Sequence, residues 1–232
     1  MGDEVTFSIL AFDDETGRIG GAAATGNLCV GGWVLRADSL AGASASQGAY
    51  PSTLWGEEAL RMMRNGKTAT ETLGALVSAD TGAVHRQLAL MDTQGKTAVH
   101  TGIENVDAKH AIAENGLVVS GNMLKSVDVI EAIFSTYKAS GSQPFEDRLI
   151  SAIEAGQNAG SDFRGLMSAA LKIVGRNSAP YDLRIDYHQA PIKALRDLHE
   201  RAQSPEYHQW LDRVPTENNP NQPADGEQKI DQ

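Results

Sequence analysis

The sequence has little of what several common classes of protein need. It holds one cysteine, Cys29, so it can form neither an internal disulfide nor a metal site made only of cysteines. No run approaches the roughly 20 apolar residues that span a bilayer. The acidic start, residues 1–4, lacks the basic and then apolar stretch of a secretory signal. We therefore expect a cytoplasmic protein without a membrane partner.

Basic residues and familiar motifs are also scarce. Lys and Arg total 20 against 30 Asp and Glu, which gives a formal net charge of −10. Nucleic-acid binding needs clustered basic side chains, so we expect no nucleic-acid partner. The sequence contains no G-x-x-x-x-G-K-[ST], no G-x-S-x-G and no H-E-x-x-H. We accordingly expect no cofactor and no bound metal.

Glycine, by contrast, is abundant, with 23 residues. Residues 5–12 alternate apolar and small polar side chains, which predicts a strand. Residues 19–25 (IGGAAAT) predict a second strand of small residues, on which another layer can pack closely. Further strands are expected over 28–35, 40–46, 86–92, 96–101, 117–120, 168–174 and 182–186.

Helices are expected in two pairs and a final single helix: 53–65 with 68–78, 127–138 with 145–158, and 191–203. In the first, Leu54 and Met63 are expected on the buried side. Thr68 is the expected N-cap of the second, and Glu71 completes a capping box. Residues 211–232 are polar and rich in proline, which predicts a disordered acidic tail.

Strand hairpins separated by helix pairs are typical of an α+β layered fold rather than of strict βαβ alternation. We predict a four-layer αββα sandwich of two antiparallel sheets in one domain, residues 1–210. An open α+β sheet is the alternative.

Two groups of polar residues are candidates for chemistry. On a strand, Asp186 and His188 project from one face and can form a carboxylate–imidazole pair or supply two metal ligands. We favour the alternative that Arg184 pairs with the neighbouring acids, because no third ligand can be named. Asn122 follows Gly121 at a strand end, where it can stabilise an oxyanion or simply form a turn. His85 precedes a strand. We expect Cys29 to be buried and His100, His110, His199 and His208 to lie on the surface.

Five short segments in order resemble one family: 5–10 (VTFSIL), 85–88 (HRQL), 121–124 (GNML), 164–171 (RGLMSAAL) and 182–188 (DLRIDYH). Over about residues 5–200 the chain is similar to the domain of unknown function 1028 family. That family is assigned to the Ntn-hydrolase-like fold, so the resemblance implies an αββα sandwich.

The resemblance also implies a nucleophile. Ntn hydrolases use an N-terminal Thr, Ser or Cys, whose own α-amine acts as the base. The matching residue is Thr6, with Asn122, His85, Asp186 and His188 as candidate polar neighbours. Five residues precede Thr6 here, so its nitrogen is an amide until the chain is cut. No lysine that would activate it lies within 19–32.

Three hypotheses follow. The first is an Ntn-type amidohydrolase acting on a small amide or peptide. The second is a protein on an Ntn-like scaffold that binds a small ligand or assembles without catalysis, as a homodimer for example. The third is a metal-dependent hydrolase built around Asp186 and His188.

Overall fold

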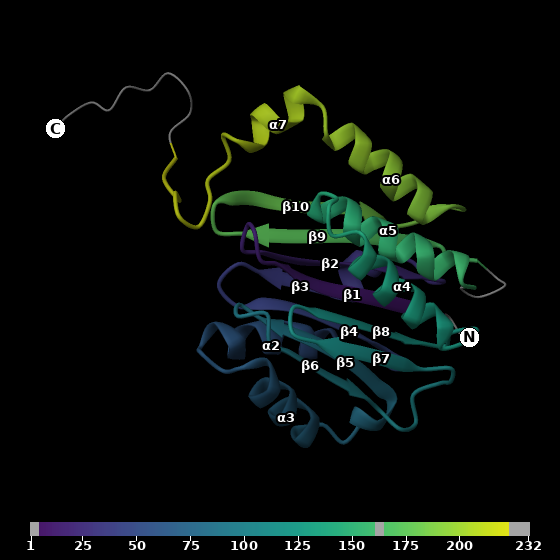
Figure 1. The fold of residues 1–232 in the computed structure, drawn as a ribbon. Helices are drawn as coiled ribbons and strands as arrows, with labels where there is room; N and C mark the ends of the chain where they lie inside the picture. The colour runs from purple at the N-terminus through teal and green to yellow at the C-terminus, as the bar shows by residue number, and fades with distance from the viewer. Residues whose placement is uncertain (1–4, 161–164, 223–232) are drawn as a thin grey trace.

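The chain folds into two antiparallel sheets with helices on their outer faces (Figure 1). The computed structural model of the protein describes residues 5–160 and 165–222. The larger sheet has the strand order β10 (Ser178–Ile185), β9 (Ser168–Gly175), β2 (Arg18–Thr25), β1 (Thr6–Asp13), β8 (Leu117–Asn122) and β7 (His110–Glu114). The smaller has the order β3 (Leu35–Asp38), β4 (Gly42–Gly48), β5 (Arg86–Asp92) and β6 (Thr97–Thr101).

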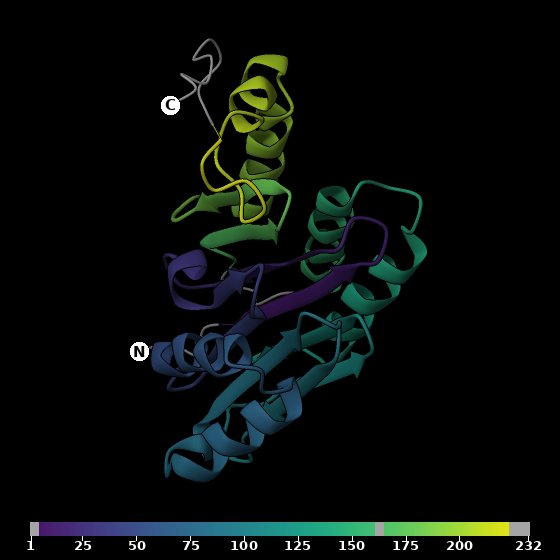
Figure 2. The same ribbon diagram turned by 90° about the vertical axis from the view of Figure 1, so that its left-hand side faces the viewer.

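The two helix pairs lie on opposite sides of the sheets (Figure 2). Helices α4 (Asp128–Ala139) and α5 (Phe145–Asn158) pack on the six-stranded sheet, and α6 (Pro191–Ala202) packs on its β9 and β10 edge. Helices α2 (Thr53–Arg64) and α3 (Ala69–Ala79) cover the four-stranded sheet. The shorter elements are α1 (Val30–Trp33), the 3-10 turn η1 (Ala83–His85) and α7 (Pro205–Leu211).

The period of two along β1 explains this layering. Phe7 and Ile9 point toward α4 and α5, whereas Leu10 points toward the smaller sheet. Between the sheets the core combines five buried alanines, Ala23 and Ala45 among them, with larger side chains such as Leu10 and Met91. At Gly21 an added Cβ would lie 2.3 Å from the backbone oxygen of Ile9. Small residues in β2 are therefore required for the close approach of its neighbours.

Most of the expected elements are present. The α+β arrangement with two antiparallel sheets is confirmed. So is the capping box of α3, in which the Thr68 hydroxyl accepts from the Glu71 amide and the Glu71 carboxylate accepts from the Thr68 amide.

The strand expected over 28–35 is wrong. Cys29 adopts φ 60°, which turns the chain into α1 before β3 begins. An added Cβ on Gly31 would lie 2.8 Å from the Cβ of Ala170, so the turn packs directly on β9. Cys29 itself is half-buried rather than buried.

Two helix positions also differ from expectation. Leu54 is 76% exposed, and its neighbour Trp55 is buried instead. The buried face of α2 contains Trp55, Ala59 and Met63, so Met63 is buried as expected and only the position of Leu54 was wrong. Strand β7 and helix α7 were not predicted. The residues of β7 are at most half-buried and α7 has no buried residue, so neither element has the buried apolar face that a sequence pattern reveals.

Part of the tail that we expect to be disordered falls within the described residues. The Asn218 amide donates to the carbonyl oxygen of Arg176 at 3.0 Å, in the β9–β10 turn. Thr216 and Asn219 form an isolated bridge. Residues 1–4 and 223–232, and Arg164 of the resembling segments, lie outside the described residues. Among the described helices, none has the length and apolar character to span a bilayer.

A matched pair of isoleucines tests the larger core. Ile133 of α4 is 0% exposed, whereas Ile103 is 81% exposed. Ile133→Ala should lower the free energy of unfolding by about 2–5 kcal/mol, because it leaves a cavity. Ile103→Ala should change it by less than about 0.5 kcal/mol. Urea unfolding followed by circular dichroism measures both, and equal effects would contradict the described packing.

Candidate functional site

One end of the sandwich gathers most of the candidate residues, and we call it the Thr6 end. Thr6 lies opposite both Thr25 of β2 and Asn122 of β8, and Ser168 of β9 lies opposite Thr25. Gln47, near the end of β4, and Gln87, near the start of β5, lie at the same end of the sandwich. It lies beside the N-terminus at the right of Figure 1.

Thr6 points between the two sheets. Residues at even positions of β1 face the smaller sheet, as the Ser8 hydroxyl shows by donating to Gln47 Oε1 at 2.8 Å. The Thr6 hydroxyl lies 2.9 Å from the Thr25 hydroxyl and donates to it, because the single Thr25 proton is used toward the Val5 oxygen. Thr6 is half-buried, so its hydroxyl lies at the rim of the inter-sheet space.

A buried hydrogen-bond network extends inward from Thr6. Gln47 Nε2 donates to Gln87 Oε1 at 2.8 Å, and Gln87 Nε2 donates to the Thr101 hydroxyl at 2.9 Å. The hydroxyls of Ser8 and Ser120 lie 3.2 Å apart. Gln47 and Gln87 are 1% and 0% exposed, so these bonds replace water that the amides lost on folding. Every side chain of this inter-sheet network is uncharged.

Asn122 differs from the rest of the network. It is 1% exposed, yet its Oδ1 has no hydrogen-bond partner within the described ranges. A buried amide oxygen left unpaired costs about 1–3 kcal/mol. A half-turn of the amide would present its NH₂ group at the same place. Asn122 therefore offers an unused polar group directly opposite Thr6.

The carbonyl before Thr6 is held by two donors. The Val5 oxygen accepts from the Thr25 hydroxyl at 2.8 Å and from the Gly26 amide at 2.9 Å. Val5 is fully buried. Thr25 thus contacts both the Thr6 hydroxyl and the carbonyl of the peptide bond that precedes it.

His85 ends the 3-10 turn η1, and Asp186 and His188 lie in the loop after β10, all at the Thr6 end. Within residues 5–160 and 165–222, none of the three side chains bonds to Thr6. His85 Nε2 lies 3.3 Å from Glu104 Oε2, and its ring packs edge-on against Tyr50. His188 Nδ1 accepts from the Ala190 amide at 2.9 Å.

Asp186 pairs with Arg184 instead of His188. Arg184 Nη2 lies 2.9 Å from Asp186 Oδ1, and this hydrogen bond raises the pKa of the Arg184 guanidinium. Asp182 pairs with Lys172. The interpretation of Arg184 as a partner of the acids is thus confirmed for Asp186. No group of three His, Cys, Asp or Glu suited to a metal occurs among the described residues.

Thr25, Gln47 and Gln87 were not among the predicted site residues. A signal was present in 42–48 (GASASQG), where Ala43, Ala45 and Gln47 share a face of β4. A glutamine that follows two alanines on the same face of a strand indicates that the core becomes polar at that end of the strand. Its partner Gln87 is supplied by a strand 40 residues away, which no local pattern reveals.

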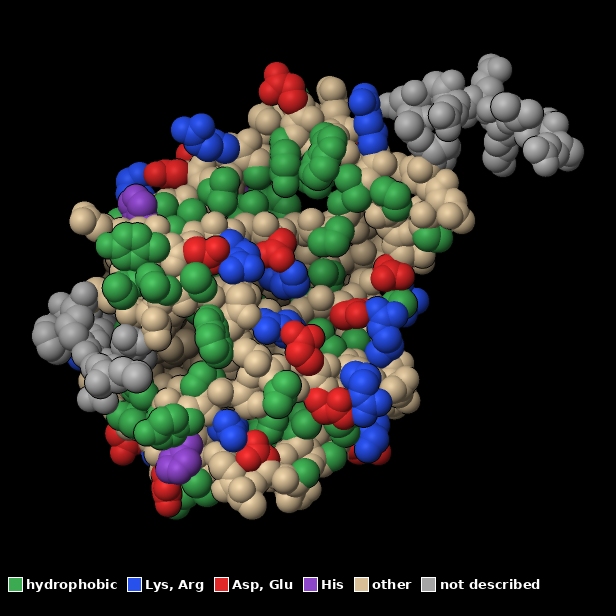
Figure 3. All heavy atoms as spheres, turned by 180° about the vertical axis from the view of Figure 1, so that it is seen from behind, with side chains coloured by type: hydrophobic (Ala, Val, Ile, Leu, Met, Phe, Trp, Pro, Cys, Tyr) green, Lys and Arg blue, Asp and Glu red, His purple; other side chains and the backbone are tan. Residues whose placement is uncertain are grey.

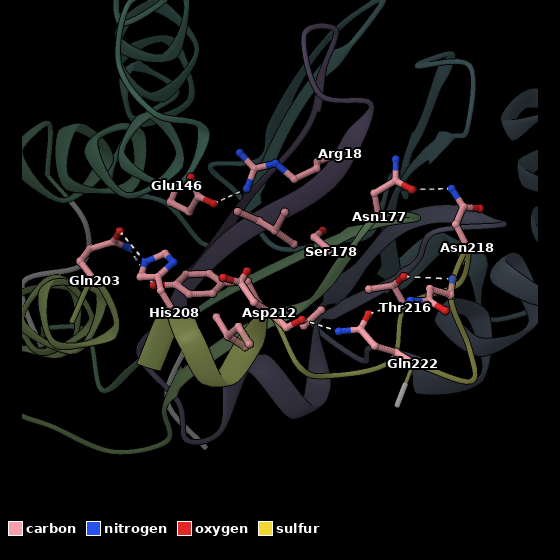
Figure 4. Close-up of a pocket in the computed structure, with 15 residues that line it drawn as sticks. Arg18, Glu146, Asn177, Ser178, Gln203, His208, Asp212, Thr216, Asn218 and Gln222 are labelled. Atoms are coloured by element: carbon pink, nitrogen blue, oxygen red, sulfur yellow. Dashed lines mark hydrogen bonds and ion pairs between the residues drawn. The ribbon is translucent and has the colours of Figure 1, made fainter. Parts of the chain in front are cut away.

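A cavity of about 680 Å³ lies at the opposite end, between the β9–β10 turn, α6 and α7 (Figure 4). Arg18 pairs with Glu146 there, and Asn218 bonds to Asn177. Burial raises the pKa of Tyr181, which lines the cavity, to about 12. Tyr181 also bonds to Nδ1 of His199, which is 4% exposed rather than a surface histidine.

A model of a family of unknown function, DUF1028, matches residues 6–195. The chain belongs to this family. The crystal structure of protein SPO2555 from Silicibacter pomeroyi, itself assigned to DUF1028, is 46% identical with a TM-score of 0.89. The match covers 94% of this chain and 98% of that one. No curated protein matches this DUF1028 chain.

The inter-sheet network can be tested with two glutamines. Gln47→Leu removes the donor to Gln87 Oε1 and should lower the free energy of unfolding by about 1–3 kcal/mol. Gln94→Leu, on the exposed β5–β6 hairpin, should change it by less than about 0.5 kcal/mol. Denaturant midpoints compare the two variants, and a neutral Gln47→Leu would refute the network's structural role.

Proposed function

We propose that this DUF1028 chain is an Ntn-type amidohydrolase acting on a small amide or peptide, with Thr6 as its nucleophile. The observation that carries the proposal is the position of Thr6. It begins β1, faces the space between the two sheets and lies opposite Asn122, whose buried Oδ1 has no partner among the described residues. The proposal also assigns the sandwich to the Ntn-hydrolase-like fold.

The proposed reaction needs a free amine on Thr6. The α-amine would take the proton of the Thr6 hydroxyl while Oγ1 attacks the substrate carbonyl carbon. Asn122, with its NH₂ turned inward, would donate to the oxyanion. The C–N bond then breaks, the proton passes to the leaving amine, and water hydrolyses the Thr6 ester. His85, Asp186 and His188 would line the approach.

Release of that amine requires cleavage of the Val5–Thr6 bond. The two donors on the Val5 oxygen, the Thr25 hydroxyl and the Gly26 amide, polarise this carbonyl and would stabilise negative charge on it. The Thr6 hydroxyl lies beside the same Thr25 side chain. This arrangement supports cleavage at Val5–Thr6.

Intact mass and substitution test the proposal together. The active species should have the mass of a chain beginning at Thr6. Thr6→Ala should lower amide hydrolysis by about 10³-fold or more, because no other nucleophile replaces the hydroxyl. Thr6→Ser should retain activity.

Thr70→Ala is the matched control, because Thr70 is exposed on α3 away from the Thr6 end. Its activity should equal that of the wild type. Full hydrolysis by a chain that retains Val5, or by Thr6→Ala, would exclude this mechanism.

A second function is favoured by one observation. In the uncut chain the Thr6 nitrogen is an amide and cannot act as the base, while the buried Asn122 Oδ1 still has no partner among the described residues. The same site would then bind a small neutral ligand through Asn122 without turning it over.

Thermal unfolding distinguishes the two functions. A ligand at 100 times its Kd should stabilise the uncut chain by about 2.7 kcal/mol, which raises Tm by roughly 5–10 °C for a chain of this size. Asn122→Ala should remove that shift. Chemical change of the ligand during the scan would contradict a purely binding function.

A further inference from the structure

Exposed hydrophobic side chains are concentrated at the Thr6 end. The described residues include nine exposed large hydrophobic side chains: Leu28, Trp33, Tyr50, Leu54, Ile103, Val127, Tyr187, Tyr207 and Trp210. The last two belong to α7, at the opposite end. The other seven lie in the segments that follow β2, β4, β6, β8 and β10, each of which ends at the Thr6 end. Scattered surface hydrophobics are normal, but such a concentration around one site indicates binding.

Three of these side chains lie in segments that follow strands of the larger sheet. Leu28 and Trp33 lie in the β2–β3 connection, and Tyr187 follows β10. The Cys29 amide donates to the Asp186 oxygen at 3.0 Å, which brings the two loops together. Ser168, opposite Thr25, holds the first loop by accepting from the Val30 amide. We call Leu28, Trp33 and Tyr187 the upper wall.

Three others lie in segments that follow strands of the smaller sheet. Tyr50 and Leu54 follow β4, and Ile103 follows β6. The Ala49 amide donates to Asn105 Oδ1 at 2.9 Å, which joins these two loops. We call Tyr50, Leu54 and Ile103 the lower wall. Figure 3, seen from behind, shows hydrophobic side chains above and below the grey residues on the left, where the Thr6 end lies.

Several charges at this end are paired within the protein. Arg184 pairs with Asp186, and Lys109 pairs with Asp107 at 3.3 Å. Lys125 is exposed and has no acidic partner among the described residues. The inter-sheet network behind Thr6 is uncharged throughout. A charged group carried into this network would lose water without meeting a counter-ion.

We infer that the Thr6 end takes an uncharged amide whose flanking groups are apolar, one against the upper wall and one against the lower wall. This inference rests on the proposed function, since the walls flank the nucleophile Thr6. It names the class of substrate: neutral amides of apolar acyl groups. Charged amides of the same length are excluded by desolvation.

Three amides of 7-amino-4-methylcoumarin test the inference, because they differ only at the far end of a six-carbon acyl chain. The hexanoyl amide is neutral, the adipoyl amide is anionic and the 6-aminohexanoyl amide is cationic. We expect the full chain carrying Thr6→Ala to bind the neutral probe at least ~10-fold more tightly than either charged probe, the scale of discrimination that apolar pockets achieve. Fluorescence polarisation measures binding, and release of the dye by the wild type measures hydrolysis.

Two tryptophans of similar exposure provide the matched control. Trp33 on the upper wall is 53% exposed, and Trp210 on α7 is 56% exposed. Trp33→Ser should weaken binding of the hexanoyl probe by about 10-fold, and Ile103→Ser should do the same for the lower wall. Trp210→Ser should leave it unchanged. Thermal melts confirm that each variant is folded.

The outcomes separate this inference from the proposed function. Tight binding of the hexanoyl probe without hydrolysis by the wild type supports the apolar site and overturns the hydrolase. Preferred hydrolysis of a charged probe supports the hydrolase and overturns the inference. Equal effects of Trp33→Ser and Trp210→Ser also overturn it. A last outcome would also overturn the inference: the wild type binds none of the probes and sediments as a dimer, and Trp33→Ser sediments as a monomer. The walls would then be the interface between two copies of the chain.

Discussion

The arrangement of the Thr6 end depends on the contact of the two sheets through Gln47. Its side chain bonds to Ser8 of the larger sheet and to Gln87 of its own. Farther from Thr6, the inter-sheet space is filled by apolar residues, five of which are buried alanines. At the Thr6 end the two glutamine amides take that volume, and each must be hydrogen-bonded because it is buried. This requirement fixes how β1 of the larger sheet packs over β4 of the smaller sheet.

The same requirement explains the chemistry that the end can support. Hydroxyls and amides that satisfy one another leave a neutral interior, and beside it the buried Asn122 Oδ1 has no partner among the described residues. The loops outside this interior carry paired charges and exposed apolar side chains. A neutral interior and an apolar rim favour an uncharged ligand, whether the Thr6 hydroxyl attacks it or only contacts it.

Local sequence patterns correctly predicted the elements whose conformation depends on residues close by in the sequence. Alternation in β1, the Thr68 and Glu71 capping box and the periodicity of α5 each depend on neighbours within a few positions. Prediction failed where distant segments decide. Residues 28–35 look like a strand, but the left-handed Cys29 and the packing of Gly31 on Ala170 make a helical turn. Leu54 and Trp55 are both apolar, and only the contact of α2 with β4 and β5 selects Trp55 as the buried one.

The sequence alone determined the layered α+β class, the antiparallel hairpins, the helix caps and the start of a strand at Thr6, since all of these follow from local spacing and side-chain chemistry. The tertiary structure decided which polar residues meet. Thr25, Asn122 and Gln47 approach Thr6 through strand pairing and sheet packing over separations of 19 to 116 residues. His85, Asp186 and His188 share that end of the sandwich, but their side chains contact other residues there: Glu104, Arg184 and Ala190 respectively. Side-chain contact across such distances is set by register, which short-range patterns do not encode.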